Sequence, residues 1–547
     1  MRTLLYSILP LLAAQSVLAQ DSFPAGGGAG AGEVRSERPG RALAIDPYIE
    51  VSQILTAELS PGDDVLTFTQ LAAGVDATVA GRRSAGTVSL RYERNIGWGD
   101  ANSSDVLTGL ARGYTTLVPD AVTLEAGALA SRTSVSQDGL SVFAPNVDFD
   151  NSSQTYSAYV GPNVRTRIDD VDVTGSYRLG YTRVEAPDVV TADGRADVFD
   201  ESVTNNAQVR AGFAPGTYAP VGVGVGAGYI REDISTLDQR VEDAYVRADV
   251  TVPVTPTLAF VGGVGYENVE VSSRDALRDA NGVPVLGDNG RIRTDEASDR
   301  VIAFEADGLI WDVGVLWRPS RRTSLSAGFG RRYDSETYFG NFAWAPDRNT
   351  SVNVSAYDGI SGFGGRLGNT LAALPVDFEV IRDPFTGQII GCTTATGGGS
   401  CLDGLLGSVR SSVFRSRGVS ATVSRRVGRY TASLAAGYDR RRFIGAPGTV
   451  LELADGITDE SLYLASGLTG QLSRNSRFSV TSYVNWFESG FVDGADAVSL
   501  GTAAAYFRDV GRSLTARAAI SLNYIDSDNL TEDLKTASAL VGLRYGF

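Results

Sequence analysis

The chain has no histidine, one methionine, two cysteines and a single lysine, Lys535, among 547 residues. Without histidine, Ser-His and Asp-His catalysis is excluded, because both need an imidazole as general base. Carboxylates are scattered through the sequence without a spacing that suggests an acid/base pair. We therefore predict no catalytic residues, no metal site and no cofactor, and an enzyme is the least favoured functional class.

The chain also lacks a basic surplus and a long apolar run. Its formal net charge of -16 argues against nucleic acid as a partner, since phosphate binding needs a clustered basic face. Beyond residue 20 we find no stretch of about 18 apolar residues, so no membrane-spanning helix is predicted. A hydrophobic fraction of 43% is ordinary, but a membrane barrel gives the same average because alternate residues face lipid and lumen.

The N-terminal residues MRTLLYSILPLLAAQSVLAQ have the pattern of a secretory signal peptide. Arg2 precedes an apolar run, which ends in a small-residue cleavage pattern. We predict a signal peptide at 1–19, cleaved after Ala19. The Gly/Ala/Ser-rich residues that follow, 20–43, predict a flexible periplasmic leader.

The two cysteines, Cys392 and Cys401, flank TTATGGGS. In an exported protein such a pair indicates a disulfide that closes a small loop. Their spacing matches no zinc pattern. We predict a Cys392–Cys401 disulfide, with two unpaired thiols as the alternative.

From the leader to the end, segments of alternating apolar and polar residues recur without a change in composition. In IWDVGVLWR, for example, Trp311 and Val313 share one face, while Asp312 lies on the other. A period of two residues predicts β-strands with two different faces. Tryptophans at the ends of such segments favour membrane girdles over secreted β-sandwiches or a β-helix.

The connections alternate between short turns and longer polar loops. This arrangement is typical of a transmembrane barrel with periplasmic turns and extracellular loops. We predict an all-β, antiparallel up-and-down transmembrane barrel over residues 44–547 in the outer membrane of a Gram-negative bacterium, with about 22 strands in a range of 18 to 24. The long loops are predicted at 134–152, 187–202, 272–300, 359–410 and 443–458.

Charged residues on the polar faces of these strands should face the lumen, because an arginine facing lipid at mid-membrane costs about 2–4 kcal/mol. They either set selectivity or only form structural ion pairs, and both interpretations stay open. The lumen-lining candidates are Glu50, Arg91, Glu93, Asp172, Arg178, Arg247, Asp249, Asp312, Arg318, Arg517 and Arg544.

The chain ends on TASALVGLRYGF, an alternating strand with a terminal aromatic residue. It resembles the signal by which outer-membrane barrels are recognised for insertion. This implies the barrel-assembly machinery as a partner and a last strand that pairs with the first, near DPYIEVSQILTAEL. The signal residues are Val541, Leu543, Tyr545 and Phe547.

Three segments between residues 46 and 132 resemble a group of alphaproteobacterial outer-membrane β-barrel proteins: DPYIEVSQILTAEL, LAAGVDATVAGRRSAGTVSLRYERNIGW and GLARGYTTLVPDAVTLEAGALASR. That group is related to porin families and to barrels associated with exopolysaccharide and PEP-CTERM systems. Some relatives are labelled preprotein translocase subunit YajC, a short protein with one hydrophobic helix that nothing here matches. The resemblance implies location and fold, without catalytic residues.

These observations favour a porin or export channel, with exopolysaccharide or small solutes as cargo. The alternative is a structural or surface-interaction barrel with a filled lumen and functional extracellular loops. Outer-membrane lipid and lipopolysaccharide are expected partners in both cases. A transporter with a large N-terminal plug is disfavoured, because too few residues separate the cleavage site from the first strand.

Overall fold

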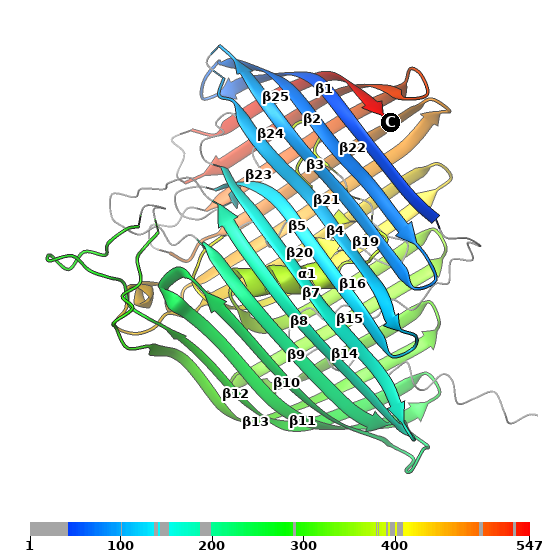
Figure 1. Cartoon of the computed structure of the whole chain (residues 1–547), viewed down its shortest axis with the longest axis vertical. Coiled ribbons are helices and arrows are strands. Elements are labelled where there is room, and N and C mark those ends of the chain that lie inside the picture. The colour runs from blue at the N-terminus through cyan, green and yellow to red at the C-terminus, as the bar shows by residue number, and fades with distance from the viewer. Residues whose placement is uncertain are drawn as a thin grey trace, which may run out of the picture.

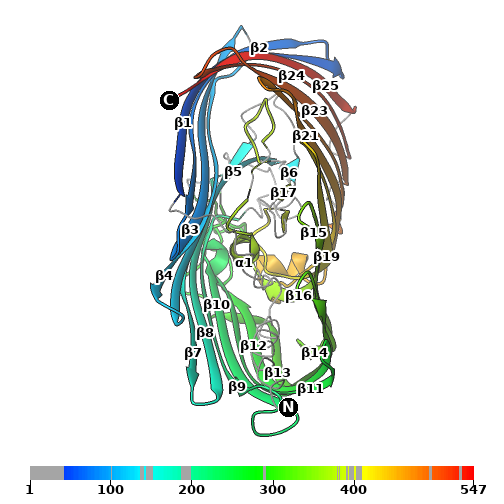
Figure 2. The same cartoon turned by 90° about the vertical axis from the view of Figure 1, so that its right-hand side faces the viewer.

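The computed structural model shows one antiparallel β-barrel with a folded segment inside it (Figure 1, Figure 2). It describes residues 42–99, 101–135, 141–142, 152–185, 199–287, 291–378, 380, 382–389, 392–393, 400–401, 409–491, 496–528 and 532–547. The predicted signal peptide at 1–19, its cleavage after Ala19, and all but the end of the predicted leader lie outside these residues.

The main sheet has 23 strands, of which the two-residue β6 (Ser141–Val142) pairs only with the end of β5; the other 22 form the barrel. The predicted fold class and strand number are therefore confirmed. The barrel strands are β1 (Ala42–Ser60), β2 (Val65–Ala80), β3 (Ser84–Trp98), β4 (Ser104–Val118), β5 (Val122–Val135), β7 (Ser152–Ile168), β8 (Val171–Glu185), β9 (Glu201–Phe213), β10 (Gly222–Ile234), β11 (Gln239–Thr255), β12 (Leu258–Ser273), β13 (Val301–Ser320), β14 (Thr323–Arg332), β15 (Ser335–Asp347), β16 (Thr350–Ser361), β19 (Phe414–Val427), β20 (Tyr430–Phe443), β21 (Thr458–Ser473), β22 (Ser476–Glu488), β23 (Ala497–Asp509), β24 (Leu514–Ser527) and β25 (Leu534–Gly546).

The last strand closes the barrel on the first. β25 pairs antiparallel with β1, from Tyr48 opposite Gly546 to Ser60 opposite Lys535. The backbone amide of Phe547 also donates to the Pro47 carbonyl at 3.2 Å. Closure pairs the edges of the sheet, as a spanning structure in lipid requires.

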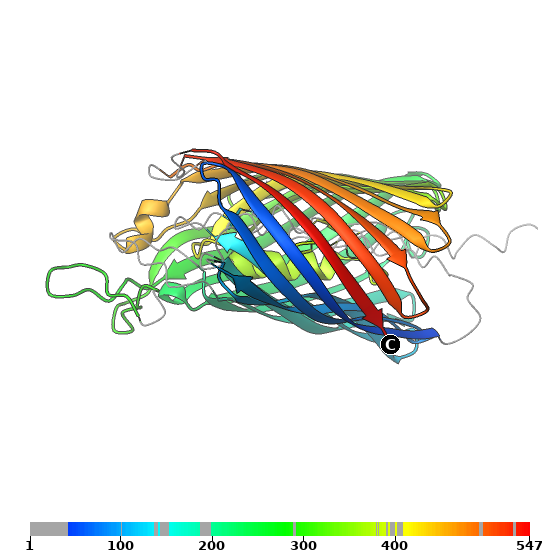
Figure 3. The same ribbon diagram turned by 90° about the horizontal axis from the view of Figure 1, so that it is seen from above.

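Connections at the two ends of the barrel differ, as the sequence predicted. At one end most turns are short, for example Ile168 to Val171 and Asp347 to Thr350, and the longest runs from Phe213 to Gly222. At the other end are the long connections, including the one between β12 and β13, which projects beyond the strands (Figure 3). Two short 3-10 helices lie there, η2 (Thr236–Asp238) and η3 (Val450–Ala454). The short-turn end is therefore periplasmic and the long-loop end extracellular.

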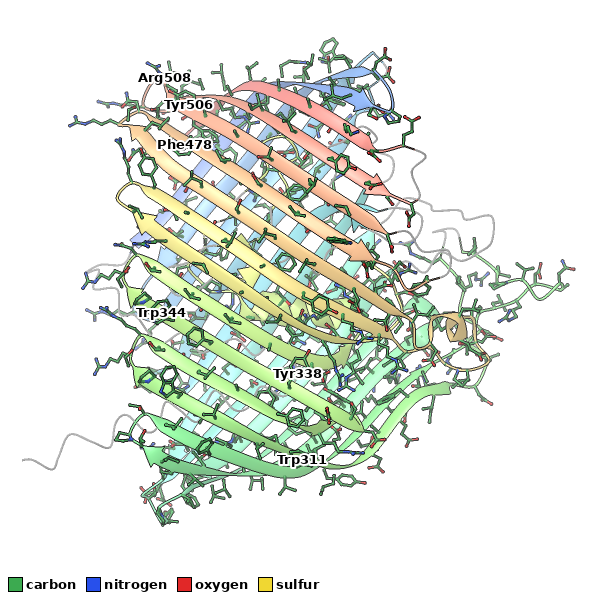
Figure 4. The ribbon with its side chains drawn as sticks, turned by 180° about the vertical axis from the view of Figure 1, so that it is seen from behind. Trp311, Tyr338, Trp344, Phe478, Tyr506 and Arg508 are labelled. Carbon is green, nitrogen blue, oxygen red and sulfur yellow. The ribbon has the colours of Figure 1, made fainter. Side chains whose placement is uncertain are left out.

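The outer face of the barrel is apolar and carries aromatic side chains near both ends. In Figure 4, Trp344, Phe478 and Tyr506 lie toward the short-turn end, and Trp311 and Tyr338 lie toward the opposite end. This is the aromatic-girdle pattern of outer-membrane barrels. Among the described residues, no helix is long and apolar enough to cross a membrane. The protein is an integral barrel of the Gram-negative outer membrane.

Glycines on the lumen face make room for aromatic rings from the adjacent strand. A Cβ atom at Gly74 would collide with the Tyr48 ring on β1. The absence of a side chain therefore lets each ring lie flat across its neighbour, which explains part of the high glycine content. The same relationship joins Gly127 to Tyr159, Gly228 to Tyr245, Gly437 to Tyr463 and Gly501 to Tyr483.

Candidate functional site in the barrel lumen

The connection between β16 and β19 folds into the lumen. It contains helix α1 (Phe363–Ala373), which Figure 2 shows inside the ring of strands. The helix contacts β5, β7, β8, β9 and β16. We predicted a loop at 359–410 that could fold into the lumen or outward; the part of it that the structure describes folds into the lumen.

Apolar packing fixes α1 against the wall. Phe363, Leu367 and Leu371 recur every fourth residue, so they lie on one face of the helix. All three are buried in a cluster with wall residues that include Val184 and Ile234. Such a cluster excludes water and makes the segment part of the folded core.

A buried carboxylate on the wall holds the N-terminus of the helix. Glu232 on β10 accepts the backbone amides of Gly362 at 2.8 Å and Gly365 at 2.7 Å. The first amides of a helix have no partner within the helix, and a carboxylate there also complements the helix dipole. Glu232 therefore anchors α1 at the position where the chain turns inward.

Two glycines permit this close approach. A Cβ atom at Gly364 would collide with the Ser202 hydroxyl, and one at Gly365 would collide with the Glu232 carboxylate. Gly368, on the same helix, has nothing within 4 Å of the equivalent point. A side chain at 364 or 365 would therefore displace Ser202 or Glu232 from its position against the helix, whereas one at 368 would displace nothing.

A second anchor is a turn in the same segment, residues 383–388. The Asp383 carboxylate accepts the backbone amides of Phe385 at 2.9 Å and Thr386 at 2.8 Å, which fixes the turn. Burial raises the pKa of this carboxyl, against the lowering effect of those two amides. The turn is therefore an internally satisfied unit that can be buried.

Side chains of β2, β3 and β4 hold this turn against the wall. The Gln70 amide donates to the Phe385 carbonyl at 3.0 Å, and the Thr108 hydroxyl donates to the Gly387 carbonyl at 3.0 Å. Arg382 donates to Thr108 Oγ1 at 2.6 Å and to Ser89 at 3.1 Å. The segment is thus bonded to the first strands of the barrel as well as to β10.

The phenyl ring of Phe385 packs near the closing seam. It belongs to an apolar cluster with Ile54, Phe68 and Leu540 from β1, β2 and β25, and with alanines from β23 and β24. The segment therefore reaches from the β7–β10 wall to the seam.

A third anchor joins the helix to the facing wall. The Arg366 guanidinium lies 3.7 Å from Asp439 on β20 and stacks over the Tyr357 ring at 3.8 Å. The Tyr357 hydroxyl donates to Asp439 at 2.8 Å, and Arg441 pairs with the same carboxylate at 2.8 Å. The Ser416 hydroxyl also donates to Asp439 at 2.6 Å, so one buried carboxylate collects four partners from the helix and the wall.

Several predicted lumen residues meet around Glu50 on β1. Its carboxylate pairs with Arg91 at 2.6 Å, Arg517 at 2.9 Å and Arg544 at 3.7 Å. Arg91 also pairs with Glu93. The first strands and the last strands thus share one ion-pair network inside the seam.

A second network joins three more predicted residues to one that the sequence reading missed. Arg247 pairs with Asp312 at 2.7 Å and Asp249 at 3.1 Å, and Asp249 pairs with Arg210 at 2.6 Å. All four side chains are buried on the lumen face. Charged side chains that are buried this deeply need an ion-pair partner to offset their loss of hydration.

A third network was missed entirely. Arg332, at the end of β14, pairs with Asp243 at 2.6 Å and Glu267 at 2.7 Å, and its guanidinium stacks over the Tyr333 ring at 4.7 Å. Asp243 and Glu267 occupy alternate polar positions in β11 and β12, the same signal that selected Asp249. The alternation in the sequence therefore indicated that Asp243 and Glu267 face the lumen, but it did not show that both pair with Arg332 on another strand.

Three predicted lumen residues lie apart from the networks. Arg178 is 3.7 Å from Glu125 and donates to Asn369 of α1 at 3.3 Å. Asp172 pairs with Arg167 at 2.7 Å beside a periplasmic turn. Arg318 is exposed near the periplasmic end of β13.

The two cysteines lie opposite each other within the inward segment. The short strands β17 (Cys392–Thr393) and β18 (Ser400–Cys401) pair antiparallel, with Cys392 opposite Cys401. The disulfide stays a prediction. Among the described residues, no group of three or more acidic or cysteine side chains could hold a metal ion.

The terminal residues lie as an outward row. Val541, Leu543, Tyr545 and Phe547 are exposed on the outer face of β25 and just beyond it, and the rings of Tyr545 and Phe547 meet edge to face at 5.2 Å. Their role as an assembly signal stays a prediction.

Comparison with known proteins gave structural neighbours only. No protein-family model and no curated protein matches the chain. Solved structures with a similar fold include the FrpB iron transporter from Neisseria meningitidis (TM-score 0.42, 10% identity, 92% of this chain, 82% of that chain) and the ferric-catecholate import receptor Fiu from Escherichia coli K12 (0.40, 11%, 92%, 82%). The copper transporter OprC is a third (0.38, 12%, 93%, 82%). At these identities and scores we draw no function from the neighbours.

Proposed function

We propose that the protein is an outer-membrane channel whose passage is narrowed by its own inward segment, Gly362 to Val413. The observation that carries this proposal is the course of that segment, which is bonded to the wall through Glu232, Thr108 and Asp439. Barrels of 16 to 18 strands already leave an aqueous channel, so a barrel of 22 strands without internal filling would admit solutes unselectively. A fixed internal segment limits what passes.

The charged lumen wall supports passage of polar cargo. Ion-pair networks around Glu50, Asp249 and Arg332 lie on the lumen face, where their buried and paired side chains keep the wall polar. Small polar solutes are the cargo we favour. Because the chain resembles exopolysaccharide-associated barrels, an exported polysaccharide is the second cargo to test.

Single-channel recording in planar bilayers tests the proposal. The wild-type barrel should give discrete conductance steps, and a variant in which residues 363–412 are replaced by a short Gly/Ser linker should give larger steps. Absence of conductance in both proteins would overturn the proposal that the barrel is a channel.

The second candidate is a barrel that acts through its extracellular surface. It is favoured by the buried cluster between α1 and the wall and by the projecting connection of β12 and β13, where Asp279 Oδ1 accepts the amides of Asn281 at 2.8 Å and Val283 at 2.9 Å. If only the linker variant conducts, the inward segment blocks the lumen permanently. The surface-interaction function would then be preferred over the channel function.

A further inference from the structure

Four arginines form a block on the outer face of two adjacent strands. Arg415 on β19 lies directly opposite Arg442 on β20, and Arg417 lies opposite Arg440. Side chains alternate along a strand, and the intervening Ser416 is buried in the lumen. The four guanidinium groups therefore project from the outside of the barrel, where we call them the arginine block.

The arginine block lies at the extracellular edge of the membrane. Arg415 is the second residue of β19, and Arg442 is the last but one of β20. One step toward the membrane centre, the outward positions are held by Val419 and Tyr438, both exposed. Tyr338, which Figure 4 shows on this outer face, lies toward the same end. The block therefore begins where the lipid-facing belt stops, at the level of the headgroups.

Elsewhere on this rim, arginines have a carboxylate directly opposite. The cross-strand partner of Arg94 is Asp105, and that of Arg231 is Glu242. In the arginine block, Arg417 and Arg440 also have a carboxylate opposite on their other neighbouring strands, Asp358 and Glu460. Between β19 and β20, however, arginine faces arginine at two successive outward positions, which is unfavourable because like charges oppose each other. The block therefore departs from the pattern of its own rim.

Carboxylates compensate the block only in part. The buried Asp358 carboxylate accepts hydrogen bonds from Arg415 at 2.7 Å and Arg417 at 3.1 Å. Glu460 lies 3.5 Å from Arg440. Among the described residues, Arg442 has no carboxylate within ion-pair distance. The four arginines thus face two carboxylates, and the excess positive charge is on the exposed β20 side.

We propose that the arginine block binds a phosphate group of a glycolipid in the outer leaflet, the leaflet that holds lipopolysaccharide. Guanidinium groups bind phosphate oxygens in pairs, with defined geometry. Asp358 fixes Arg415 and Arg417, and Arg440 and Arg442 remain exposed to receive the phosphate. Val419 and Tyr438 directly below offer an apolar surface to the acyl chains.

Binding of purified lipid A tests this proposal. The chain is refolded in detergent without native lipid, and bound bisphosphorylated lipid A is counted by native mass spectrometry during a titration. We expect Arg440→Gln/Arg442→Gln to weaken binding about tenfold or more, since two charge-assisted contacts are lost. Arg442→Gln alone should weaken binding less, and it serves as the test if the double variant does not refold.

The matched control removes two arginines from the other end of the outer face. Arg425→Gln/Arg508→Gln should bind lipid A as the wild type does; Figure 4 shows Arg508 at that end. Equal binding by both double variants, or undiminished binding of dephosphorylated lipid A, would overturn the proposal. Equal binding of cardiolipin would assign the block to anionic phospholipid and overturn the choice of glycolipid.

Discussion

The Glu232 carboxylate on β10 accepts the backbone amide of Gly365 on α1 at 2.7 Å, across 133 residues of sequence. Glu232→Ala removes this bond and the one to Gly362, which leaves two buried amides without their acceptor, at a cost of about 1–3 kcal/mol each. We expect new protease cleavage within residues 363–378 of the folded barrel, mapped by mass spectrometry. Glu242→Ala, a change on the outer face of β11, should leave the cleavage pattern unchanged. Full protection in Glu232→Ala would show that apolar packing alone holds the helix.

Alanine substitutions at Gly365 and Gly368 give a second test of the contact between Glu232 and α1, this time a steric one. Gly365→Ala brings a methyl group into the Glu232 carboxylate, so it should lower the melting temperature and expose the segment to protease. Gly368→Ala has open space and should stabilise the helix by roughly 1 kcal/mol, since alanine is the better helix former. Thermal unfolding of the two variants should therefore shift in opposite directions. A shift in the same direction would contradict the proposed close approach.

Glu50 should be the carboxylate whose loss weakens the seam most. Glu50→Ala leaves Arg91, Arg517 and Arg544 without their shared partner, and breaking a buried pair costs about 3–5 kcal/mol. Asp172→Ala breaks only a partly exposed pair and should cost about 1 kcal/mol or less. The temperature at which the folded band is lost in heat-modifiable gel migration measures both effects. Similar temperatures for the two variants would argue against a structural role for the Glu50 network.

Deletion of Phe547 should block insertion into the outer membrane. Phe547 ends the outward row of β25 and is largely exposed, so its removal should cost little folding stability while it removes the terminal aromatic group. Membrane fractionation and heat-modifiable migration report insertion. Phe547→Tyr keeps the aromatic ring and should insert normally. A deletion variant that inserts at the wild-type level would show that the signal lies elsewhere.

Cys392 and Cys401 should form a disulfide in exported protein. Their backbones are paired directly opposite each other, a register that is compatible with a disulfide. Unfolded, unreduced protein should take up no thiol-alkylating reagent, and two equivalents after reduction. Alkylation without reduction would show two free thiols instead.

The period of two residues and the alternation of connection lengths were sufficient to predict the barrel, because each depends only on local sequence. Trp311 and Val313 face outward and Asp312 inward, as their positions required. The long connections also fall at one end of the barrel, although that end holds a two-residue turn from Arg332 to Ser335 as well. These properties do not depend on which distant strand a residue faces.

The interior was harder to predict, because it depends on distances across the lumen. Alternation placed Glu50 and Arg517 on the lumen face, but their meeting requires the seam. The spacing of Phe363, Leu367 and Leu371 was a helix signal within the predicted loop. The partner of that helix, Glu232, could not be identified, since nothing local specifies which wall an inward segment will reach.

The course of the inward segment has a consequence for the order of assembly. Phe363 and Leu367 lie between β16 and β19, whereas the wall that buries them is made by strands formed much earlier in the chain. Contacts of such sequence separation form late and require a large loss of chain entropy. Phe385 in turn packs on both sides of the β1–β25 seam. We therefore expect closure of the wall and filling of the lumen to be coupled, because the inward segment contacts strands on both sides of the seam.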